Sequence, residues 1–194
     1  MYIARRWFFA VLALTLGLAA LLREGHAQLP DNPDHERSLA PQAKMVQQDA
    51  GVQLPPKLAI LPIKLLDTSA EPTDQSADHA RRLETMASGL AVHLQESGLY
   101  QTVKVEPDAL RLNCRDEAPE CLLKLAREGG ARLVFVAVVQ KSSTLILRIW
   151  ARIVDAETGK VAFSRDLNFR GDTDEAWRRA EAFLVDQLKA APIR

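Results

Sequence analysis

The chain has 194 residues, and its 25 lysine and arginine residues balance 25 aspartate and glutamate residues, so its formal net charge is zero. The chain therefore lacks the strong positive charge of a typical nucleic-acid-binding protein. The length that follows the apolar amino terminus is enough for one domain with its own hydrophobic core.

Residues 1–27 have the layout of a cleavable secretory signal. Arg5 and Arg6 form a positive start, residues 7–22 form an apolar run, and small residues end the segment at Ala27. We therefore expect cleavage after Ala27 and export to the periplasm. A retained membrane anchor is the alternative, although a spanning helix usually needs about 20 apolar residues. The arginine pair also resembles a twin-arginine export signal.

Residues 28–56 are predicted to form a flexible tether. Prolines recur through this stretch and apolar residues are sparse, so it cannot bury enough surface to offset the entropy lost on ordering. One α/β domain is expected over residues 57–191.

The domain begins with a strand, a helix and a second strand. The apolar strand over residues 58–63 contains Pro62, which cannot donate to a strand ladder and predicts a bulge or a strand end there. Apolar residues at spacings of three and four predict a helix over residues 78–97. The short strand over residues 100–105 is expected to end before Pro107.

The centre of the sheet is predicted at residues 133–139. Every position there is apolar, a pattern tolerated only in a strand that is covered on both faces. Residues 141–143 are expected to form a tight connection to a strand over residues 145–154, and a hairpin then leads to the last strand, over residues 161–169.

Two further helices complete the domain. The first is expected over residues 119–128, with its proline near the first turn. The second is expected over residues 172–190, where Asp172 and Glu175 have the spacing of a capping box.

The resulting order is β-α-β-α-β-β-β-α. Because parallel crossovers are right-handed, the two βαβ units place the first strand between the second and the third. We predict an α/β fold with a five-stranded mixed sheet in the order 2-1-3-4-5, strand 4 antiparallel to the others, and helices on both faces.

Cys114 and Cys121 predict one disulfide, because exported proteins fold in an oxidising compartment. A metal site would need more ligands nearby, and a redox pair usually has closer spacing. No catalytic residue, metal ligand or cofactor is predicted.

A ligand site is considered at the carboxyl ends of the first and third predicted strands, where the strand order reverses. The alternative is an ordinary loop with a lysine–aspartate contact, since the hairpin that follows could fill the crevice. The residues expected there are Asp67, Thr68, Ser69, Gln140, Lys141 and Ser142.

A partner surface is considered on the fourth predicted strand. Arg148, Trp150 and Arg152 alternate along it and project from one side, and tryptophan and arginine are enriched at binding hot spots. The alternative places Trp150 under the carboxyl-terminal helix. Trp177 is expected to anchor that helix in the core.

Five segments together resemble a family of small secreted bacterial proteins of unknown function. The fold of this family is similar to the amino-terminal domain of TolB and to periplasmic accessory proteins such as CsgG and LpoB. The resemblance implies no catalytic residues, and it associates some members with periplasmic dehydrogenases. The segments are Lys57–Pro62, Ala126–Ala131, Gln140–Ser143, Val154–Gly159 and Arg170–Trp177.

These observations favour an exported, non-catalytic accessory that binds a protein or complex of the cell envelope. A periplasmic carrier of a small ligand or an ion is the alternative, and an enzyme is expected less. No contact with nucleic acid, and no stable membrane insertion after signal cleavage, is predicted.

Overall fold

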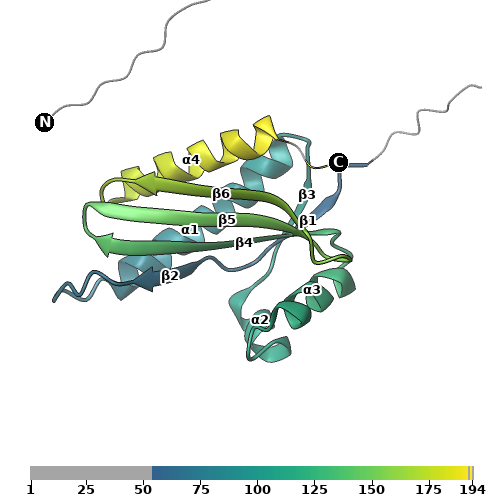
Figure 1. Ribbon diagram of the computed structural model, residues 1–194, viewed down its shortest axis with the longest axis horizontal. Coiled ribbons are helices and arrows are strands. Elements are labelled where there is room, and N and C mark those ends of the chain that lie inside the picture. The colour runs from purple at the N-terminus through teal and green to yellow at the C-terminus, as the bar shows by residue number, and fades with distance from the viewer. Residues whose placement is uncertain (1–53, 192, 194) are drawn as a thin grey trace, which may run out of the picture. The chain divides into compact units, whose positions relative to one another are not determined.

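The computed structural model describes residues 54–191 and residue 193, so the predicted signal and almost all of the predicted tether lie outside the described residues. The described part is an α/β domain in which helices lie on both faces of a mixed sheet (Figure 1). In this part of the chain, no helix is both long enough and apolar enough to span a membrane.

The order of the strands follows the prediction. β1, β4, β5 and β6 lie in that order with β3 outside β1, and β2 pairs separately with β4. β1 is parallel to β3 and β4, whereas β5 is antiparallel to β4 and β6. The predicted order 2-1-3-4-5 is confirmed. The strands are β1 (Lys57–Ile60), β2 (Lys64–Asp67), β3 (Gln101–Lys104), β4 (Leu133–Ser143), β5 (Ile146–Asp155) and β6 (Val161–Phe169).

The prediction of five strands is wrong, because the first predicted strand is two strands. β1 and β2 both pair in parallel with β4, and Leu61-Pro62-Ile63 lies between them. Pro62 has no N–H to donate, so the ladder is interrupted there. The interruption that was expected at Pro62 therefore divides one strand into two.

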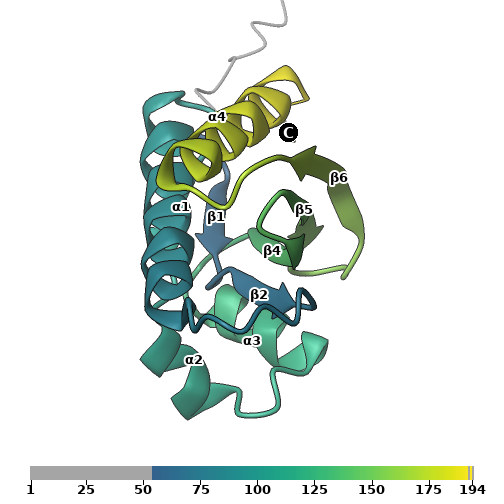
Figure 2. The ribbon, with the colours of Figure 1, turned by 90° about the vertical axis from the view of Figure 1, so that its left-hand side faces the viewer.

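The four helices form two pairs. α1 and α4 cover one face of the sheet, and α2 and α3 lie on the other face (Figure 2). α2 was not predicted, because Pro107 was interpreted only as the end of the preceding strand; proline also suits the first turn of a helix, and that is its place here. The helices are α1 (Ser76–Glu96), α2 (Pro107–Asn113), α3 (Pro119–Glu128) and α4 (Asp174–Ala190).

The cap of α4 also differs from the prediction. Thr173 is the N-cap, and its hydroxyl accepts a hydrogen bond of 3.2 Å from the N–H of Ala176. Asp172 is therefore not the first member of a capping box. Its carboxylate is buried and lies among charged groups from other elements.

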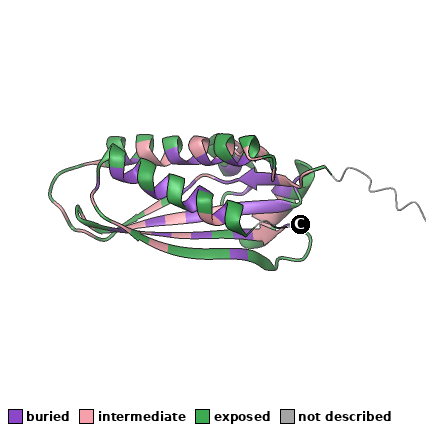
Figure 3. Ribbon diagram, turned by 90° about the horizontal axis from the view of Figure 1, so that it is seen from above, coloured by how far each residue is buried: buried purple, intermediate pink, exposed green. Residues whose placement is uncertain are grey.

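The main hydrophobic core lies between the sheet and the α1–α4 pair. Alternate residues of β4 and β5 belong to it, and among them Phe135 and Ile149 are fully buried. Figure 3 shows buried stretches on the helices as well as on the strands. Trp177 of α4 is 2% exposed and packs edge-on against Phe169, with the ring centroids 5.8 Å apart. The expectation that Trp177 anchors the last helix is confirmed. A smaller apolar cluster lies under α3 and contains Ala59 and Val134.

Candidate functional site

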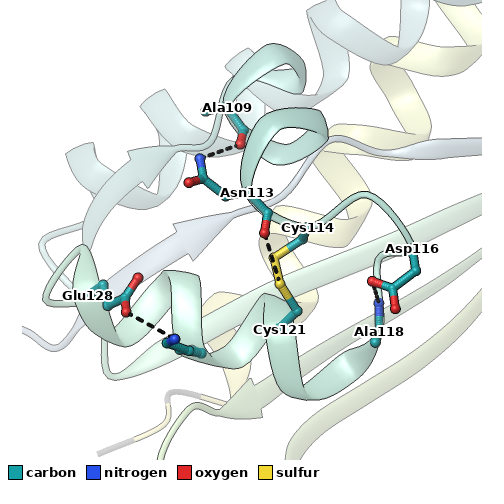
Figure 4. Close-up of a disulfide and its surroundings, with 8 residues drawn as sticks. Ala109, Asn113, Cys114, Asp116, Ala118, Cys121 and Glu128 are labelled. Carbon is teal, nitrogen blue, oxygen red and sulfur yellow. Dashed lines mark hydrogen bonds and ion pairs between the residues drawn. A yellow bond between two sulfur atoms is a disulfide. The ribbon is translucent and has the colours of Figure 1, made fainter.

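The disulfide joins the end of α2 to the beginning of α3 (Figure 4). Cys114 and Cys121 are bonded, with their Cα atoms 5.7 Å apart, so the predicted pairing is confirmed. Both helices are short, and the bond ties them into one unit that packs beside the sheet.

Some of the predicted ligand-site residues meet at the carboxyl end of β2. The Asp67 carboxylate lies 3.8 Å from the Lys141 ammonium. Thr68 donates its backbone N–H to the Lys141 carbonyl at 2.8 Å. Ser69 donates both its N–H and its hydroxyl to Asp67. The lysine–aspartate contact that was considered as the alternative to a ligand site is therefore present.

The other two predicted residues do not join this contact. Gln140 precedes Lys141 in β4 and therefore points to the opposite face of the sheet, and Ser142 is exposed. The tight connection predicted over residues 141–143 is wrong, since β4 continues through Ser143. Lys141 is consequently a strand residue whose side chain points toward α1 and α4. A ligand site at these residues stays a prediction.

Lys141 lies at the centre of a buried network of charged groups. Only 1% of its side chain is exposed. Its ammonium lies 2.7 Å from Glu71, 2.8 Å from the Gln75 amide oxygen and 3.2 Å from Asp172. Burial lowers the pKa of Lys141, but the neighbouring Glu71 and Asp172 carboxylates outweigh it and hold this pKa above its ordinary value.

Asp172 is the fully buried anion of this network. His79 Nε2 lies 2.7 Å from one carboxylate oxygen, and Arg82 and the Trp177 indole donate to the other at 2.8 and 2.9 Å. Burial raises the pKa of Asp172, but the hydrogen bonds from His79, Trp177 and Lys141 outweigh it, so this pKa lies below its ordinary value.

The network also holds the β4–β5 turn in place. Glu71 accepts hydrogen bonds from the N–H and the hydroxyl of Thr144, at the start of that turn. Each charged group named here is paired within the protein, which is the condition for burying charge without a large energetic penalty. The arrangement is that of a structural ion-pair network that connects β4, α1 and the start of α4.

Sequence reasoning missed Glu71, Gln75, His79 and Asp172. A usable signal was present for two of them, since Gln75 and His79 are four residues apart at the start of α1 and so share one face of it. No three His, Cys, Asp or Glu side chains within the described residues are grouped so that they could hold a metal ion.

Asp172 of the network and the adjacent carboxylate of Asp174, which pairs with Arg81 and Arg82, predict a loss of stability in acid. Asp172 and Asp174 have folded-state pKa values below the ordinary 3.8; the Arg81 and Arg82 hydrogen bonds lower that of Asp174 to about 2. Carboxylates of this kind stabilise the fold fully above the unfolded-state pKa, and this stabilisation is lost as the pH falls through the folded-state value. Urea unfolding should therefore show a falling free energy of unfolding from about pH 4 to pH 2.

Asp172→Asn is the control variant, because it removes one titrating group and should make the acid loss shallower. A free energy of unfolding that is equally pH-dependent in this variant and in the wild type would contradict the assignment to Asp172.

The predicted partner surface lies on the face of the sheet opposite α1 and α4. Along β5, Leu147, Ile149, Ala151 and Ile153 are buried in the main core, and the residues between them point the other way. The alternative that placed Trp150 under the last helix is therefore wrong.

The three side chains of this surface differ in their contacts. The Arg148 guanidinium lies 5.3 Å from the centre of the Trp150 ring and donates to Asp166 at 2.7 Å. Trp150 is half-buried, and Arg152 is exposed. We call Arg148, Trp150 and Arg152 the β5 surface.

An apolar groove lies next to the β5 surface. It has a volume of about 560 Å³ and runs between the open face of the sheet and the α2–α3 unit. Volumes of this order are typical of binding pockets. The lining residues include Val136 and Val138 of β4, Trp150 and Arg152 of β5, and Leu122 and Leu123 of α3.

Several solved structures are similar to this chain. A PelC dodecamer from Paraburkholderia phytofirmans has 16% sequence identity and a TM-score of 0.49, over 72% of this chain and 89% of that chain. Lipoprotein GNA1162 from Neisseria meningitidis has 16% identity and a TM-score of 0.47, over 70% of this chain and 99% of that chain. TolB from Acinetobacter baumannii has 14% identity and a TM-score of 0.44, over 71% of this chain and 28% of that chain.

The comparison of sequences identifies the family. No curated protein matches the chain. The family model DUF3280, described as "Protein of unknown function (DUF2380)", matches residues 56–188, and the protein therefore belongs to this family of unknown function.

Proposed function

We propose that this protein is exported to the periplasm and acts there as a non-catalytic accessory, by binding another protein of the cell envelope. The observation that carries the proposal is the β5 surface beside an apolar groove. A half-buried tryptophan, two arginines and a hydrophobic floor are the usual components of a binding hot spot.

Two further observations support this proposal. The Cys114–Cys121 disulfide suits an oxidising compartment, in agreement with the signal pattern of residues 1–27. The titratable groups that the fold gathers, around Lys141 and Asp172, are buried and paired with one another. They suit a structural role better than proton transfer to a substrate.

Affinity capture from a periplasmic extract tests this function. The full chain with residues 1–27 removed should retain a reproducible protein that mass spectrometry identifies. Trp150→Ala should lose this protein, because it removes the largest side chain of the β5 surface. Thermal melting should show that the variant is folded.

Arg165→Glu provides the matched control. Arg165 lies on the neighbouring strand β6, where it stacks on Phe163 and contacts Gln187 of α4, so it belongs to the other face. This variant should retain the partner. Capture that is independent of Trp150, or the absence of a reproducible partner, would refute the proposal.

A carrier of a small apolar ligand is the second candidate, and the groove of about 560 Å³ is the observation that favours it. A screen of metabolites by thermal shift tests this candidate. A rise in melting temperature with one compound, abolished by Trp150→Ala, would support a carrier over an accessory.

A further inference from the structure

We infer that the groove binds a short extended segment of the partner protein that carries aliphatic side chains and at least one carboxylate. This inference rests on the proposed function, because it specifies the chemistry of the partner at the β5 surface. It depends on the charges around the groove, on the length of the groove and on the groups that could occupy it.

Among the described residues, one cation that lines the groove has no neutralising partner. Lys64 pairs with Glu117, and Arg148 pairs with Asp166. Arg152 lines the groove and makes no hydrogen bond or ion pair with the described residues. A guanidinium beside an apolar surface is a strong recognition element for a carboxylate, which it can bind with two parallel hydrogen bonds.

The floor of the groove requires an apolar counterpart. Val136 and Val138 lie beside Trp150 on the open face, and Leu122 and Leu123 form the opposing wall. An occupant with polar groups against this floor would lose its hydrogen bonds to water without replacing them. Aliphatic side chains on one side of the occupant satisfy this condition.

The length of the groove suits about six residues of an extended chain. Its lining extends from Lys64 on β2, across β4 and β5, to Val161 on β6. Three strand spacings of about 4.8 Å give about 14 Å across the strands. Lys64 is level with Trp150 of β5 and Val161 is level with Val154, so the two ends are also offset by four residues, about 13 Å along the strands. The diagonal is about 19 Å, and an extended chain that rises about 3.3 Å per residue crosses it with about six residues.

A second copy of this chain fits the groove less well. A twofold contact would bring the same face of the second copy against the groove. Glu117, which lines the groove, and Asp166 of β6 are already paired with Lys64 and Arg148. A second copy would therefore have to break one of these two pairs to present Glu117 or Asp166 to Arg152.

Fluorescence anisotropy with three labelled heptapeptides tests this inference on the full chain without residues 1–27. The sequences alternate Glu-Leu, Lys-Leu and Glu-Ser, respectively, and each peptide begins and ends with its charged residue. We expect the Glu-Leu peptide to bind at least about tenfold more tightly than either of the others. Equal binding of the Glu-Leu and Lys-Leu peptides would overturn the inference.

A charge reversal at Arg152 separates recognition from damage to the fold. Arg152→Glu should weaken the Glu-Leu peptide at least about tenfold and strengthen the Lys-Leu peptide. Arg165→Glu, on the other face, should change neither affinity. If Arg152→Glu leaves both affinities unchanged, the carboxylate is not recognised at this position and the inference is wrong.

Three other outcomes would assign the groove to a different occupant and overturn the inference. Light scattering could show a dimer that Arg152→Glu dissociates. Decanoate could displace the Glu-Leu peptide and raise the melting temperature. Replacement of Asp31, Asp34 and Glu36 by their amides in the full chain could strengthen peptide binding, which would identify the chain's own acidic stretch as the occupant.

The results also separate this inference from the proposed function. If a captured partner depends on Trp150 but the peptides show no preference for Glu-Leu, the accessory function stands and only the partner chemistry is wrong. If no partner is captured, the proposed function fails whatever the peptides show.

Discussion

Asp172→Ala is expected to lower the free energy of unfolding by about 3–5 kcal/mol. The Asp172 side chain is fully buried, and it neutralises Lys141 and Arg82 while also accepting from Trp177. Its removal takes away the buried counter-charge that Lys141 and Arg82 share, although Glu71 and Asp174 remain beside them. Urea unfolding followed by circular dichroism at neutral pH measures the loss.

Asp174→Ala is the matched control for this prediction. Asp174 also pairs with Arg81 and Arg82 at the start of α4, but nearly half of its side chain is exposed. Exposed ion pairs contribute about 0–1 kcal/mol, so this variant should change the stability little. Equal losses in the two variants would show that burial of the network does not determine its energetic importance.

Replacement of both cysteines by serine is expected to lower the free energy of unfolding by about 2–3 kcal/mol. Cys114 and Cys121 are seven positions apart, so the bond closes a short loop and restricts the unfolded chain only over that span. Urea unfolding of the double variant, and of the wild type with dithiothreitol, should give the same reduced value. An unchanged free energy of unfolding would show that the disulfide does not stabilise the folded state.

The same double variant should also affect the groove. Leu110 of α2 and Pro119 of α3 line it, so the disulfide holds two parts of one wall together. We expect the Glu-Leu peptide to bind more weakly after the bond is lost, with the main core intact. Binding that is unaffected would show that the wall keeps its position without the disulfide.

The strand order could be predicted because it depends on patterns that are local. The apolar run at the start of β4 identified the central strand, and the helices between the first three strands required parallel crossovers of one hand. The division at Pro62 was also foreseeable, since proline cannot donate to a ladder. The pairing of both pieces with β4 could not be foreseen, because pairing depends on which strand lies next to them in space.

The local errors have a common cause. α2 has only seven residues, too few for an apolar period to appear. Asp172 had the spacing of a capping residue, but Thr173 caps α4. Either residue type can cap a helix; burial of the Asp172 carboxylate against Lys141 and His79 decides between them, and those partners lie 31 and 93 positions away in the chain.

The candidate sites divide in the same way. The alternation along β5 was enough to place Arg148, Trp150 and Arg152 on one side of a strand. The face to which that side belongs depends on where α4 packs. The sequence likewise suggested a contact between Asp67 and Lys141, but not the contribution of α1, which brings Gln75 and His79 to the network.

The sequence by itself therefore determined the α/β class, the strand order, the disulfide and the side of β5 that carries Trp150. Each of these depends on periodicity, chain direction or the chemistry of one residue type. Only the tertiary structure decided that Lys141 is buried among carboxylates and that Arg152 borders an apolar groove. Burial and pairing depend on which distant segments share a space, and no local pattern encodes that.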